Sequence, residues 1–114
     1  MNDVAALNAA EDPGMKEAII ITERVLGEIT AMLNAENIFT NAVQQQMLTS
    51  HIRAMVLRSI TSEPLPEVDK SLFDEISAHS MKMAQQVVDE FPNLPIEEAY
   101  LLSVHFEVAK DNNS

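Results

Sequence analysis

Three histidines and one arginine are the side chains in this sequence best suited to chemistry. His51, His79 and His105 are widely separated, and Arg58 follows His51 by seven residues, nearly two helical turns, so that the two share one edge of a helix. A neutral imidazole near pH 7 is a nucleophile that can take a phosphoryl group, and a nearby arginine can hold the added charge with forked hydrogen bonds. His51 and His105 are therefore candidate phosphorylation sites, with Arg58 as the phosphate-stabilising residue. About two added negative charges at a helix edge would make this a switch rather than a turnover site.

Other chemistries find less support in the sequence. A metal site built from the three histidines is conceivable, but each stands alone on its predicted helix without a second ligand at suitable spacing, and the chain has no cysteine. Hydrolase, zinc-protease, calcium-loop and dinucleotide motifs are absent. We therefore predict no enzyme activity, no metal and no cofactor, and keep a small metal-dependent or acid–base enzyme only as a third hypothesis. His79, at the margin of an apolar face, is interpreted as a hydrogen-bonded core residue.

Composition predicts an all-α protein. The chain has 114 residues, 46% of them hydrophobic, with two glycines and no tryptophan, which suits one globular helical domain. No apolar run reaches the roughly 18 residues that span a membrane, and no export signal is visible at the N-terminus. We therefore expect no membrane insertion and a cytoplasmic location.

The charge balance limits the kinds of partner. The chain carries 18 acidic and 7 basic residues, a formal net charge of -11, and the basic residues are dispersed. Because binding to phosphate backbones depends on clustered lysine and arginine, direct nucleic-acid binding is not expected. Anionic membrane surfaces are disfavoured for the same reason.

The apolar pattern predicts a compact bundle of four to five helices. Residues 1–12 are expected to form a flexible arm, and residues 13–112 a single domain. The first helix begins at Asp12-Pro13, and the second, capped by Thr40, runs to about Ile60. A third long helix is expected from about residue 68 to 91, its inner side including Leu72, Phe73, Ile76, Met83, Ala84 and Val87. An extra short helix is possible at residues 35–40.

The last helix is the one around which the others are expected to pack. Pro95 can start it, Glu97 and Glu98 oppose the positive end of its dipole, and Lys110 meets the negative end. Between residues 96 and 109 nine of fourteen residues are apolar and cover most of the circumference, so we expect other helices on all sides. His105 lies within this apolar wall.

Two segments resemble a known family, the phosphotransferase-system regulation domain, or PRD. Residues 48–58, LTSHIRAMVLR, are similar to the family's segment in which arginine follows a histidine by seven residues. Residues 94–105, LPIEEAYLLSVH, resemble its last-helix segment, which ends in the second histidine. The resemblance covers roughly residues 13–112. It implies a PRD-like helical fold and phosphorylation of His51 and His105 by a phosphocarrier or a sugar-specific transporter subunit of the sugar phosphotransferase system.

The resemblance also has departures. The family usually has an acidic residue before its first histidine, where this chain has Ser50. Familiar members carry two such domains behind an RNA- or DNA-binding module, whereas this sequence shows neither a second copy nor such a module. We therefore expect a stand-alone sensory domain that acts in carbohydrate-dependent regulation through protein–protein contacts. Because domains of this family commonly pair through their helices, we also expect a homodimer. The alternative is a helical scaffold or assembly subunit that keeps the fold without phosphorylation, which Ser50 favours.

Overall fold

The described residues fold into a bundle of α-helices. The computed structural model describes residues 13–113, in which α2 (Pro13–Ala35), α3 (Ala42–Thr61), α4 (Ala78–Val88) and α5 (Glu97–Lys110) are joined by loops and two 3₁₀ turns, η1 (Lys70–Phe73) and η2 (Asp111–Asn113). This range contains no strand, which confirms the all-α prediction. The predicted arm at residues 1–12 lies outside the described residues.

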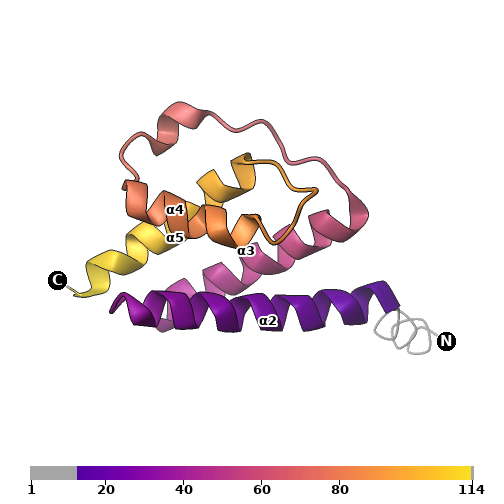
Figure 1. The fold of residues 1–114 in the computed structure, drawn as a ribbon, viewed down its shortest axis with the longest axis horizontal. Coiled ribbons are helices and arrows are strands. Elements are labelled where there is room, and N and C mark those ends of the chain that lie inside the picture. The colour runs from indigo at the N-terminus through magenta and orange to yellow at the C-terminus, as the bar shows by residue number, and fades with distance from the viewer. Residues whose placement is uncertain (1–12, 114) are drawn as a thin grey trace.

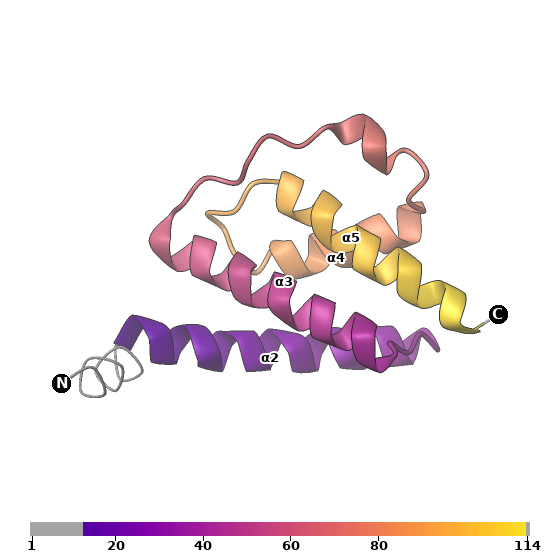
Figure 2. The same cartoon turned by 180° about the vertical axis from the view of Figure 1, so that it is seen from behind.

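The helices are arranged as two pairs. α2 packs along α3 and α4 along α5, and the pairs meet through contacts of α3 with α5 and of α2 with α4. The long connection from α3 to α4 arches over the α4–α5 side, as both views show (Figures 1 and 2). α3 therefore lies between α2 and α5, and α5 lies between α3 and α4.

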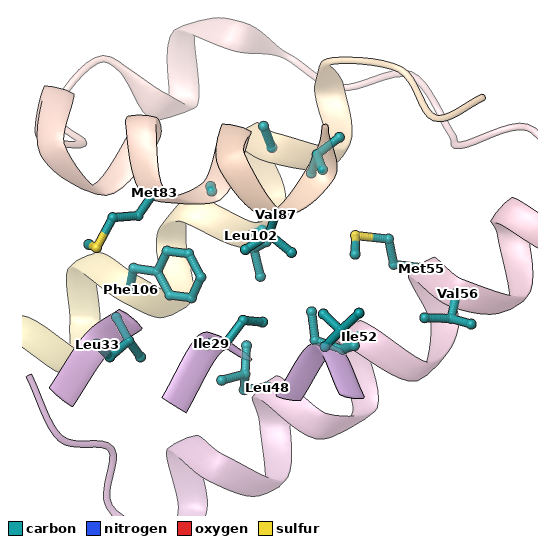
Figure 3. Packing of buried hydrophobic residues seen from close by; sticks show 14 of the residues in the cluster. Ile29, Leu33, Leu48, Ile52, Met55, Val56, Met83, Val87, Leu102 and Phe106 are labelled. Carbon is teal, nitrogen blue, oxygen red and sulfur yellow. The ribbon is translucent and has the colours of Figure 1, made fainter. Parts of the chain in front are cut away.

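Each long helix turns an apolar face into a shared core (Figure 3). In α3 all four residues of the predicted apolar centre are buried, namely Leu48, Ile52, Met55 and Val56. They meet Ile29 and Leu33 of α2, Met83 and Val87 of α4, and Leu102 and Phe106 of α5. Among the described residues, no helix is long and apolar enough to cross a membrane.

Short polar side chains set the limits of α3. Asn41 caps its N-terminus in a capping box: the side chain accepts a hydrogen bond from the Gln44 amide, and the Gln44 side chain accepts one from the Asn41 amide. The expected cap, Thr40, instead hydrogen-bonds to Gln45. α2 ends before Asn37, which adopts a left-handed conformation, and no short helix forms at residues 35–40.

The predicted third helix from residue 68 to 91 is wrong as a single element. The chain forms η1, breaks at residues 74–77 and restarts as α4. Ser77 causes the restart, because its hydroxyl accepts from the Ser80 amide while its own amide donates to Glu107 of α5. Leu72, expected on the inner side, is 75% exposed, whereas Met83, Ala84 and Val87 are buried as predicted.

The expectation that other helices surround the last helix is corrected. α5 is not surrounded, because Ile96, Val104 and Val108 of its predicted apolar wall are exposed and only the opposite face is buried. In α2 the apolar stripe is buried over most of its length, but Met15 and Ile19 at its N-terminal end lie open. The molecule therefore has exposed apolar side chains on both α2 and α5.

Candidate functional site

Packing of α5 against α3 brings His51 and His105 together. Their ring centroids are 5.0 Å apart, and the ring planes are inclined at 55°. The two residues lie 54 positions apart in the sequence, so this pair exists only in the fold. Two of the three candidate histidines thus form one site at the α3–α5 contact.

Both imidazoles are partly buried, and burial favours their neutral form. It lowers the pKa of His51 to about 4, with further lowering by the neighbouring His105 and by the charge of Arg58. Burial also lowers the pKa of His105. The Nε2 atom of His51 is buried and has no hydrogen-bond partner among the described residues. Neutral imidazoles at pH 7 keep a free lone pair, which is the form that can act as a nucleophile.

The pair opens to the surface through a shallow hollow. Gln46, Met47 and Ser50 line it together with the two histidines. His105 also borders an adjoining apolar hollow formed with Val104 and Val108. His105 is therefore the member of the pair that faces two surface hollows. Ser50, which also lines the first hollow, occupies the position before the first histidine that was noted above as a departure from the family's usual acidic residue.

Arg58 lies beyond the pair and is already engaged. Its Nε and one terminal nitrogen donate to the two carboxylate oxygens of Glu98 on α5, each at 2.7 Å. The Glu98 side chain is fully buried, so this fork is the partner that compensates its charge. Glu98 had been predicted only as a helix-dipole residue. The sequence signal for its real role is its position on the last helix seven residues before His105, nearly two turns away, which places the two on the same edge of the helix.

A second polar cluster fixes α5 against α4. The Glu107 carboxylate accepts hydrogen bonds from the amide and hydroxyl of Ser77, and the Lys110 ammonium donates to both Ser77 and Glu107. Partial burial alone would raise the pKa of Glu107, but hydrogen bonds from Ser80, Ser77 and Lys110 together lower it to about 2. The helix that carries His105 is thus held by charged contacts at both ends.

His79 is not part of the site. It is exposed rather than in the core, which corrects its interpretation, and its Nε2 lies 3.4 Å from a carboxylate oxygen of Glu36. It is not among the residues that line the hollow of His51 and His105. Among the described residues there is also no group of three or more side chains placed to hold a metal ion.

The described residues thus form a small helical domain with two histidines in contact between α3 and α5. A solved structure described as a PRD-containing transcription regulator from Lactobacillus casei ATCC 334 is similar to this chain, with 36% sequence identity, a TM-score of 0.76, and coverage of 80% of this chain and 81% of that one. The chain therefore belongs to the PRD family. No protein-family model matches the sequence. No curated protein matches it either.

Proposed function

We propose that this PRD-like domain is phosphorylated on histidine at the His51–His105 pair and passes on the state of the sugar phosphotransferase system through protein contacts. The observation that carries the proposal is the 5.0 Å approach of the two histidines that the sequence motifs single out. The similar Lactobacillus casei protein is described as a transcription regulator, which fits a role in carbohydrate-dependent transcription regulation. With a net charge of -11, the output is proposed to be a protein contact rather than direct binding of nucleic acid.

The surroundings of His105 suit a protein phosphodonor. Val43 and Met47 of α3 and Val104 and Val108 of α5 are exposed apolar residues on the two helices that carry the pair. Exposed apolar side chains beside a reactive group favour docking of another protein over capture of a free small molecule. A phosphocarrier or a sugar-specific transporter subunit is the proposed donor, which places the domain in the cytoplasm. Arg58 is the proposed phosphate-stabilising residue, and because its Nε and one terminal nitrogen are bound to Glu98, it would do so through its remaining N–H groups or by releasing Glu98.

Intact mass spectrometry tests the proposal. The protein is incubated with phosphoenolpyruvate and the general phosphotransferase proteins, with and without sugar-specific subunits. An acid-labile phosphoryl adduct is expected on the wild type and on a His79→Ala control, and is expected to be lost when His51 and His105 are both replaced by alanine. If the double variant is phosphorylated to the same extent as the wild type, the proposed site is wrong.

A phosphorylation-independent scaffold is the alternative function. The buried Nε2 of His51 favours it, because a nitrogen without solvent access cannot reach a donor unless the site moves. Native mass spectrometry with candidate partners separates the two. A scaffold assembles equally well whether or not the protein has been exposed to the phosphodonor, whereas a regulatory domain changes its partners.

Self-association is proposed through the open end of α2. Met15 and Ile19 line an apolar groove between α2 and α3, and the adjacent Ile20 is 66% exposed. A homodimer would bury this surface. Ile19→Glu is expected to shift the protein to a monomer in light-scattering measurements, while Ala31→Glu, which adds the same charge elsewhere on α2, leaves the mass unchanged. A wild-type monomer at high concentration would rule the dimer out.

A further inference from the structure

The two histidines are not equivalent as phosphoryl acceptors. The Nε2 of His51 is buried without a partner, whereas His105 borders both surface hollows. In-line attack requires the acceptor nitrogen to approach the phosphorus of the donor along an open path. The geometry therefore favours His105 as the residue that a donor reaches.

The hollow offers no free cation for a phosphoryl group. Its described lining consists of Gln46, Met47, Ser50 and the two histidines, without lysine or arginine. Arg58 is not among these lining residues, and the Nε and Nη2 edge of its guanidinium is bound to the fully buried Glu98, which would be left as a buried charge without a partner if the arginine were released. A dianion on His105 would need a different positive group, and His51 stands 5.0 Å away.

We propose that the pair accepts a single phosphoryl group, on His105, and that His51 then takes up a proton and holds that group as a positioning residue by donating a hydrogen bond from its ring. The inference rests on the proposed function, because it assigns separate roles to the two residues of that site. In the transfer, a bond forms between a His105 ring nitrogen and phosphorus as the bond from phosphorus to the donor breaks. The N–H proton that His105 loses goes to the leaving group of the donor, and the proton on His51 comes from solvent.

Electrostatics explains both why the pair would hold only one phosphoryl group and why His51 would take up a proton. In the unmodified protein the groups that act on His51 are His105 across the helix contact and Arg58 further along α3, whose charge is balanced by Glu98. None of these groups favours a proton on His51. A dianion at His105 reverses the balance, because an opposite charge within about 4–6 Å favours the charged imidazolium. A second dianion on His51 would face the first across the same contact and is disfavoured by the same interaction.

Phosphoramidate provides a test that is independent of any protein donor. This small reagent transfers its phosphoryl group directly to imidazole, with ammonia as the leaving group. Because the reagent also reaches the exposed His79, the test is made in a His79→Gln background. Intact mass is expected to show one phosphoryl group per chain in this background and after the further change His51→Gln, but none after the further change His105→Gln.

Nitrogen-15 NMR of the His51 ring gives a readout that a merely structural role would not move. In the wild type, phosphorylation is expected to raise the midpoint of the His51 titration by about two pH units. Because this comparison uses only wild-type protein, it stands even if a variant folds poorly. Two phosphoryl groups per chain in the His79→Gln background, undiminished labelling after His105→Gln in that background, an unmoved His51 midpoint, or no adduct at all would each overturn the proposal.

The outcomes also separate this inference from the proposed function. If phosphoramidate labels His105 and the His51 titration moves, but no phosphotransferase protein labels the chain, the inference stands and the proposed donor is wrong. If the proteins label both histidines, the proposed function stands and the division of roles fails.

Discussion

Acidification is predicted to destabilise the protein through the buried imidazole of His51. In the folded protein its pKa is lowered from 6.5 to about 4, chiefly by burial. Between these two values the unfolded chain binds more protons than the folded one, so stability is lost as pH falls through this window. A difference of 2.5 pH units corresponds to about 3 kcal/mol once both states are protonated, and about 2 kcal/mol is already lost between pH 7 and pH 5.

Urea unfolding followed by helical circular dichroism at pH 7, 6 and 5 measures this loss. A His51→Leu variant removes the titrating group while keeping an apolar side chain at the site, and it shares every carboxylate with the wild type. The wild type is expected to lose about 2 kcal/mol more than the variant over this range. Burial lowers the pKa of His105 as well, so the variant keeps a smaller loss of the same sign.

A matched control isolates burial from histidine content. His79→Gln removes a histidine that lies exposed at the surface beside Glu36, and it serves as the control for a change in histidine content alone. The burial argument would be refuted if wild type and His51→Leu lost the same free energy between pH 7 and pH 5. A steeper loss in the variant would refute the sign of the effect.

Three further predictions test the contacts that hold α5 in place. Arg58→Ala should lower the free energy of unfolding in urea by about 3–5 kcal/mol, because it leaves the buried Glu98 without its partner. The double variant Arg58→Met, Glu98→Leu should recover most of this lost free energy. Equal losses in the single and the double variant would contradict this reasoning. Phe106→Ala should cost about 3–5 kcal/mol in the same assay, and a loss below 1 kcal/mol would contradict its place in the core. Glu107→Gln should be less stable than the wild type at pH 7. Because the pKa of Glu107 is lowered from 4.5 to about 2 in the folded protein, its stabilising effect is complete above pH 4.5 and is lost as the pH falls towards 2, so the difference in melting temperature should shrink over this range. A difference that stays constant would contradict this prediction.

Helix periodicity predicted those parts of the fold in which burial is one-sided and continuous. The apolar centre of α3 was predicted residue for residue, because its 3–4 spacing places Leu48, Ile52, Met55 and Val56 on one face. The same reasoning failed for α5, where apolar residues occur on both faces. Periodicity cannot tell which of two apolar faces packs inside, and Val104 and Val108 proved to be on the outer one.

The break before α4 depended on a contact distant in sequence. Ser77 is followed by helix-forming residues and preceded by Ile76, so the local pattern favours one continuous helix. What stops it is Glu107, thirty residues later, which accepts from the Ser77 amide and hydroxyl. Such a tertiary hydrogen bond cannot be read from local spacing, and it outweighs local helix propensity.

The histidine pair was predictable in its members but not in its geometry. The motifs single out His51 and His105, yet only the packing of α3 on α5 places their rings 5.0 Å apart. The same packing assigns Arg58 to Glu98, a pairing across forty residues that the seven-residue spacing from His51 does not suggest. Whether Arg58 also stabilises a phosphoryl group stays a prediction.

The direction of any switch at this site depends on the proton of His51. The Arg58–Glu98 pair ties α5 to α3, and the Ser77–Glu107–Lys110 cluster ties it to α4, so α5 cannot move without breaking charged contacts. A dianion on His105 opposite an imidazolium at His51 attracts across the α3–α5 contact and would tighten it. A dianion opposite a neutral, buried imidazole would instead draw water into the contact and loosen it. If the pair is phosphorylated as proposed, proton uptake by His51 decides whether the added group tightens or loosens the contact between α3 and α5.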